Sequence, residues 1–122
     1  RGYYVLGIIR PNHEPSEHAL NDISALAADF DKWGGKVMLL FADEDAAKRF
    51  DASRFPKLPK TVVYGIDNDG ASMRELTESL NLTEGESPVF VIADTFNRVV
   101  YKSQGYTIGM GEKLMDVIHK LK

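Results

Sequence analysis

The sequence predicts an α/β fold: a three-layer α/β/α sandwich with a mixed five-stranded sheet in the middle. Two observations carry this prediction. Up to residue 80, apolar segments of strand length alternate three times with segments of helical periodicity, a pattern typical of parallel strands joined by helices. After residue 85, two strand-like segments separated by a tight turn precede one last helix, and strands so close in sequence must pair antiparallel.

The first strand is the clearest element of the alternating part. Residues 3–9 are apolar almost throughout, as expected of a strand that helices cover on both faces. Further strands are expected at 36–41 and 61–66, and helices at 16–33, 43–50 and 71–80.

The ends of the helix predicted at 16–33 carry clear signals. Its apolar residues recur every three or four positions, and Gly34 with Gly35 ends it. Asn12 and His13 precede Glu14 and Pro15, and an acid and a proline both suit a first helical turn.

The second part of the chain predicts strands at 88–93 and 99–102, joined by a turn at 95–98. The closing helix is expected at 111–121, where the apolar side chains share one face. The glycine-rich segment 105–111 lacks the spacing of a phosphate loop, so we interpret its glycines as allowing a tight path into this helix.

Composition narrows the function. The chain has 122 residues, 43% apolar and 27% charged, which fits one domain over residues 1–122. It begins at Arg1 without an initiator methionine or signal peptide, so we expect a fragment of a longer precursor. The net charge of −3 with no basic face argues against a nucleic-acid partner, and no apolar run is long enough for membrane insertion.

The chain contains no cysteine. This excludes disulfides, thiolate metal sites and cysteine nucleophiles within these residues.

The order of elements resembles the thioredoxin-like fold of TlpA/ResA-type thiol-disulfide oxidoreductases and related peroxiredoxin-like proteins. In that family a central strand leads into Trp-Cys-x-x-Cys at the start of a long helix. Here His13-Glu14-Pro15-Ser16 stands at that place, so the resemblance puts the two cysteine positions at His13 and Ser16 and keeps the proline.

Two further marks support the resemblance. Ser87-Pro88 precedes the strand expected at 88–93, where the family has a cis proline. The turn at residues 94–97 has Asn97 where the family has glycine, and asparagine tolerates the left-handed conformation.

The resemblance implies a vestigial site without redox chemistry. Its binding groove would be walled by His13, Ser16, Ser87 and Pro88, would accept an extended peptide, and would need no cofactor or metal. We therefore hypothesise a redox-inactive module that binds a protein, a peptide or neighbouring domains of its own precursor. Residues 90–100 and 103–109 also resemble C-terminal domains of large secreted Bacteroidetes-type proteins, which implies an extracytoplasmic, periplasmic or cell-surface, location.

A non-redox enzyme is the alternative, with His13 as the acid–base residue and Glu14 or Ser16 beside it. A Ser16–His13 nucleophile pair would also need an orienting carboxylate and an oxyanion hole, and the sequence indicates neither. Metal binding by His13 and His18 is disfavoured, because five residues on a helix separate side chains by about 140°. The acidic residues 43–45 and 67–70 are interpreted as a helix start and a turn.

Overall fold

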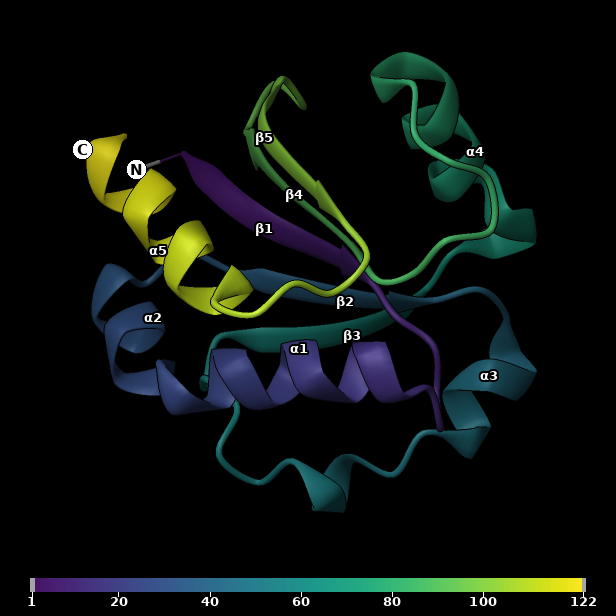
Figure 1. The fold of residues 1–122 in the computed structure, drawn as a ribbon, viewed down its shortest axis with the longest axis horizontal. Helices are drawn as coiled ribbons and strands as arrows, with labels where there is room; N and C mark the ends of the chain where they lie inside the picture. Colours follow the sequence, from purple (N-terminus) through teal and green to yellow (C-terminus); the bar gives the residue numbers. More distant parts are fainter. Residues whose placement is uncertain (1, 122) are drawn as a thin grey trace.

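A mixed five-stranded sheet forms the centre of the computed structural model, which describes residues 2–121 (Figure 1). The strand order is β3-β2-β1-β4-β5. β1 pairs in parallel with β2 and β2 with β3, whereas β4 is antiparallel to both β1 and β5. The predicted mixed sheet is confirmed, and its strands are β1 (Tyr3–Ile8), β2 (Val37–Phe41), β3 (Val62–Ile66), β4 (Val89–Asp94) and β5 (Val99–Gln104).

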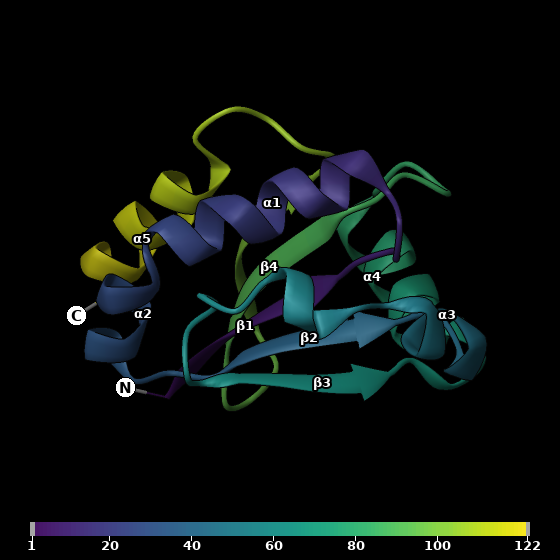
Figure 2. The ribbon, with the colours of Figure 1, turned by 90° about the horizontal axis from the view of Figure 1, so that it is seen from below.

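Helices cover both faces of this sheet, which completes the predicted three layers. The helices are α1 (Glu14–Ala25), α2 (Ala27–Trp33), α3 (Glu44–Arg49), α4 (Ala71–Leu80) and α5 (Met110–Lys120), with 3₁₀ turns at Ala52–Arg54 and Asn68–Gly70. Figure 2 shows α1 and α5 side by side over one face, and these two helices are in contact. Residues of α4 pack on the opposite face.

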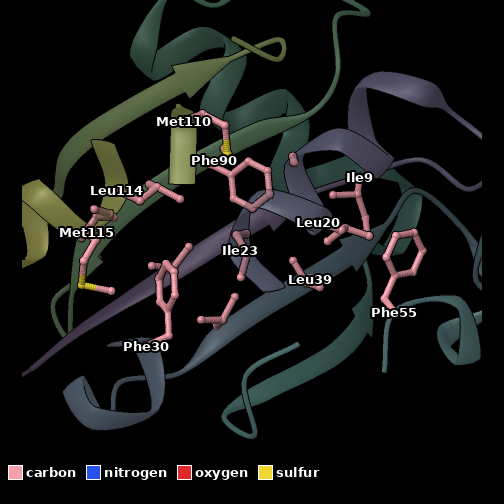
Figure 3. Packing of buried hydrophobic residues seen from close by; sticks show 14 of the residues in the cluster. Ile9, Leu20, Ile23, Phe30, Leu39, Phe55, Phe90, Met110, Leu114 and Met115 are labelled. Atoms are coloured by element: carbon pink, nitrogen blue, oxygen red, sulfur yellow. The ribbon is translucent and has the colours of Figure 1, made fainter. Parts of the chain in front are cut away.

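The alternation of side chains along β1 divides the core into two clusters. Val5 and Ile9 belong to the larger cluster, in which side chains of α1, α5 and the sheet interleave (Figure 3). Ile8 points to the other face and joins a smaller cluster that α4 covers through Met73 and Leu76. Burial on both faces explains why the sequence of β1 is almost continuously apolar.

The helix expected at 16–33 is two helices, and this part of the prediction is wrong. The break lies at Leu26, whose φ of −112° and ψ of 22° are not helical. Its N–H donates to the Ile23 carbonyl three residues back, which tightens the last turn of α1. Leu26 still packs against the core together with the buried Phe30, so the apolar periodicity continues across the break and does not reveal it.

The turn signals of the sequence are confirmed. Gly34 ends α2 with a φ of 83°, and Asn97 adopts a φ of 64° in the β4–β5 turn, as expected of a residue that replaces glycine there. The Asp94 carboxylate holds this turn by accepting hydrogen bonds from the N–H groups of Phe96 and Arg98, both at 2.9 Å.

Gly7 allows the close packing at the middle of β1. It lies opposite Phe90 of β4 in the strand register. A Cβ atom at Gly7 would come 2.4 Å from Cε1 of Phe90, so the ring occupies the space of the missing side chain. Any larger residue would have to displace a fully buried ring.

None of the helices within residues 2–121 has the length and apolar character needed to cross a membrane.

We predict that Gly7→Ala lowers the free energy of unfolding by about 1–3 kcal/mol through overpacking. Urea denaturation measures this change. In a Phe90→Leu background, Gly7→Ala should lower the free energy of unfolding less, because the smaller leucine side chain leaves room for the new methyl group. An equal loss in both backgrounds would contradict the packing explanation.

Candidate functional site

The segment His13–Ser16 forms the first turn of α1, just beyond the carboxyl end of β1. His13 is the N-cap residue, with an extended φ of −124° and ψ of 113°, and Pro15 lies in the first turn as expected. The Ser16 N–H donates to Nδ1 of His13 at 3.4 Å, so the imidazole serves as the capping acceptor.

A second set of contacts ties this turn to the end of β1. The Arg10 N–H donates to the Ser16 hydroxyl at 3.1 Å, and that hydroxyl lies 2.9 Å from Nδ1 of His13. Since the hydroxyl accepts from Arg10, its own proton is free to be donated to Nδ1. One directed chain therefore runs from the Arg10 amide through Ser16 to His13.

This chain sets the protonation of His13. Nδ1 accepts hydrogen bonds, so the neutral ring carries its proton on Nε2. Burial lowers the pKa of His13, and the nearby Arg10 charge lowers it further, while Glu17 acts in the opposite direction. The ring is therefore neutral at neutral pH and presents an Nε2–H donor.

Ser16 has a structural role in this arrangement. Its exposed fraction is 0%, and its hydroxyl is occupied by Arg10 and His13. The carboxylates nearby are turned elsewhere: Glu17 pairs with Arg54 at 2.9 Å, and Glu14 lies 3.8 Å from His18. The orienting carboxylate of a hydrolytic triad is thus missing around His13 within residues 2–121.

The Ser87–Pro88 peptide bond is cis, at the place where the resemblance puts a cis proline. Pro88 is buried, and its carbonyl accepts the Gly105 N–H at 2.8 Å. Ser87 is half-buried, and neither its N–H nor its C=O has a hydrogen-bond partner among residues 2–121. Of the four residues predicted to wall a groove, His13 and Ser87 are therefore partly exposed, whereas Ser16 and Pro88 lie beneath the surface.

A cavity of about 900 Å³ opens beside Ser87. It lies outside the carboxyl ends of β1, β2 and β3, between these ends, α4 and the segment that follows α4. Its apolar lining includes Ile8, Ile9, Met73 and Leu82, and its charged lining includes Arg10, Arg74, Glu78 and Glu84.

Sequence reasoning missed this cavity because its walls come from separate segments that no local pattern connects. A general rule could have indicated it. Ligands of open α/β sheets bind outside the carboxyl ends of the strands, where the connections on either side of a strand leave on opposite faces. The carboxyl end of β1 lies at such a place, because α1, which follows β1, and α4, which leads from β3 to the neighbouring β4, pack on opposite faces of the sheet.

Asp67 fixes the wall that α4 contributes. It is buried at the end of β3, and its carboxylate accepts the N–H groups of Ser72 at 2.7 Å and Met73 at 2.9 Å. Asp69 and Gly70 take left-handed conformations, which confirms the predicted turn at 67–70. Both oxygens of Asp67 are used by the first turn of α4, so its role is structural.

The other acidic segment also begins a helix, as predicted. Oδ1 of Asp43 accepts the Ala46 N–H at 2.8 Å, and Asp45 pairs with Arg49 at 3.1 Å. Across residues 2–121, no group of three or more histidine, aspartate or glutamate side chains is placed to hold a metal ion.

We predict that Ser16→Ala destabilises the fold by about 1–3 kcal/mol, because the part-buried Arg10 N–H loses its acceptor. Chemical denaturation provides the measurement. Ser72→Ala is the matched control, since only the backbone of Ser72 forms the hydrogen bond to Asp67. Equal stability of the two variants would refute the proposed role of the hydroxyl.

We also predict that His13 makes the fold less stable in acid. Its pKa is lowered by folding, so the unfolded chain binds the proton more readily, and stability falls as the pH drops below 6.5 towards the pKa of the folded state. Denaturation midpoints at pH 7.5 and pH 5 reveal this loss. His13→Asn keeps a capping side chain without a titrating ring, so it should lose less stability over the same interval. The same loss in both proteins would exclude His13 as its source.

Comparisons with known proteins agree with this architecture. No protein-family model matches the chain, and no curated protein sequence matches it. Among solved structures, a Chlorobium tepidum protein described as the thiol:disulfide interchange protein DsbE is 17% identical, with a TM-score of 0.67 over 98% of this chain and 79% of its own. Peroxiredoxin Q of Xanthomonas campestris is 16% identical, with a TM-score of 0.69 over 97% and 78%. The exposed lipoprotein thioredoxin Etrx1 of Streptococcus pneumoniae is 14% identical, with a TM-score of 0.61 over 97% and 84%. The chain therefore has a thioredoxin-like fold, built here from a sequence without cysteine.

Proposed function

We propose that this chain is a redox-inactive thioredoxin-like module that binds an extended segment of protein. The segment belongs to a peptide, a partner protein or a neighbouring domain of the same precursor. One observation carries the proposal: the backbone N–H and C=O of Ser87, which have no hydrogen-bond partner among residues 2–121, border a cavity of about 900 Å³.

The lack of a thiol distinguishes this proposed function from disulfide exchange and peroxide reduction. Disulfide exchange needs an attacking thiolate, and peroxide reduction needs a thiol that becomes a sulfenic acid. At the positions that the resemblance gives to cysteines, this chain has an imidazole at His13 and a buried hydroxyl at Ser16. Neither group forms a mixed disulfide.

The free backbone of Ser87 suits an extended ligand. A strand-like peptide can satisfy one N–H and one C=O through its own main chain, whatever its sequence. Selectivity then comes from side chains that enter the cavity, where Ile8, Met73 and Leu82 offer apolar surface and Arg10 a positive charge.

The geometry gives less support to the non-redox enzyme. A general base needs an unprotonated nitrogen facing its substrate. In His13 the unprotonated nitrogen is Nδ1, which Ser16 occupies, and His13 does not line the cavity beside Ser87. A peptide-binding role at the cavity does not need a general base.

An extracytoplasmic setting, periplasmic or at the cell surface, is part of the proposal. It is supported by the resemblance of residues 90–100 and 103–109 to secreted domains. The pneumococcal protein of similar fold, an exposed lipoprotein, agrees with it.

We predict that members of a random library of eight-residue peptides bind this chain at the cavity. NMR chemical-shift perturbation should locate the changes at Ser87, Arg10 and Leu82. Ala42→Trp should weaken binding at least about tenfold, because the exposed alanine lines the cavity and an indole would fill it.

The matched control is Ala28→Trp, which adds the same ring at an exposed alanine of α2. This variant should bind within about twofold of the original chain. Perturbations that map to another surface, or equal binding by both tryptophan variants, would reject the cavity as the binding site.

A further inference from the structure

β3 is an edge strand with an exposed apolar surface. It pairs with β2 on one side, and among residues 2–121 no strand pairs with its second side (Figure 2). Of six large hydrophobic side chains exposed among the described residues, three belong to this strand of five: Val63 at 40%, Tyr64 at 46% and Ile66 at 38%. Among the described residues, β3 therefore carries three exposed apolar side chains in a row of four residues, whereas Phe96, Val100 and Ile108 are exposed elsewhere.

The backbone along this edge is ready to pair. The carbonyl of Thr61 and the N–H of Asp67 bond to β2, so the alternate residues 61, 63, 65 and 67 face that strand. In a parallel pair, the residues between them point their N–H and C=O groups away from the neighbour. Among residues 2–121, the main-chain groups of Tyr64 and Ile66 have no hydrogen-bond partner.

The opposite edge of the sheet differs. β5 carries Lys102, and its pairing with β4 has a register irregularity at Ile92 and Ala93. Charged side chains and bulges are the devices by which natural sheets prevent edge pairing. Within residues 2–121, β3 contains neither a charge nor a proline, so this edge lacks both devices.

We propose that β3 is the docking surface for a second copy of this chain, paired antiparallel about a two-fold axis at Tyr64. A two-fold axis requires an antiparallel pair, in which each strand meets the same strand of its partner. With Tyr64 opposite itself, Val62 of each copy faces Ile66 of the other. This register brings together the residues whose main-chain groups point outward. Val62 contributes only its C=O, because its N–H donates to the Pro59 carbonyl at 3.2 Å.

Charge at the two ends of β3 favours the same orientation. Lys60 precedes the strand, and the exposed Asp69 follows it. In the antiparallel register, Lys60 of one copy lies beside the acidic end of the other at both ends of the interface. A parallel arrangement would instead place like charges together.

Aromatic packing extends across the proposed axis. The Tyr64 ring lies 6.2 Å from Phe41 and 5.6 Å from Phe50, measured between ring centroids. A Tyr64–Tyr64 pair would join the aromatic groups of the two copies, and cross-strand aromatic pairs stabilise antiparallel sheets. The two sheets would then form one continuous sheet.

Sedimentation equilibrium of the chain between about 10 μM and about 1 mM tests the proposal, because short interfaces associate in this range. We expect a concentration-dependent dimer. Tyr64→Lys and Tyr64→Glu should each raise the dimer dissociation constant at least about tenfold, since like charges would face each other across the axis. An equimolar mixture of these two variants should associate again, as a heterodimer.

Val100→Lys is the matched control, because Val100 is 44% exposed on the opposite edge strand. This variant should dimerise like the original chain. A monomer throughout the concentration range, a dimer that Val100→Lys alone disrupts, or folded Tyr64 variants that do not associate when mixed would each overturn the proposal.

Amide hydrogen exchange tests the same interface without any substitution. The N–H groups of Tyr64 and Ile66 should become more protected as the concentration rises, whereas those of Val63 and Gly65, which face β2, should not change. Unchanged exchange at Tyr64 and Ile66 over the full range would count against the dimer. The test is independent of the cavity beside Ser87, so failure here leaves the proposed peptide site unaffected.

Discussion

Burial of β1 on both faces is the constraint from which the rest of the structure follows. The strand has β2 on one side and β4 on the other, and helices of different layers cover its two faces. Gly7 permits this enclosure, because the Phe90 ring occupies the space beside it. With α1 leaving on one face and α4 lying on the other, the carboxyl end of β1 opens into a crevice. The candidate site lies at this end of the strand.

The first turn of α1 shows how a helix N-terminus can be capped without a thiol. A helix N-terminus favours a thiolate, and by resemblance the family uses this effect for catalysis. Here a neutral imidazole accepts the amide that needs a cap, and a buried hydroxyl links the turn to Arg10. The lowered pKa of His13 suits this role, because a protonated ring could not accept these hydrogen bonds. Nδ1 of His13 and the Ser16 hydroxyl, the atoms that an enzyme would need as base and nucleophile, are thus used to stabilise the turn.

Two surfaces offer main-chain groups that have no partner within residues 2–121, and these surfaces differ in what they can recognise. At Ser87 a single residue borders a cavity, so side chains of the bound segment would contribute much of the selectivity. Along β3 the open groups lie on a flat, apolar edge, where a strand of the same sequence can pair with itself. A dimer through β3 would leave the Ser87 cavities of both copies outside the strand pairing.

The sequence by itself determined the order of the elements, the mixed sheet and most turns, because periodicity, proline and glycine act locally. Asn97, Gly34 and Asp43 were predicted from such local chemistry, and the structure confirms them. Only the tertiary structure decided that the helix after His13 breaks at Leu26, since an apolar stripe looks the same in one helix or in two that share a core. It also decided that Ser16 and Pro88 lie beneath the surface and that Ile8, Ala42 and Leu82 meet around one cavity. Burial and proximity between distant segments depend on how the layers pack, and no local pattern encodes them.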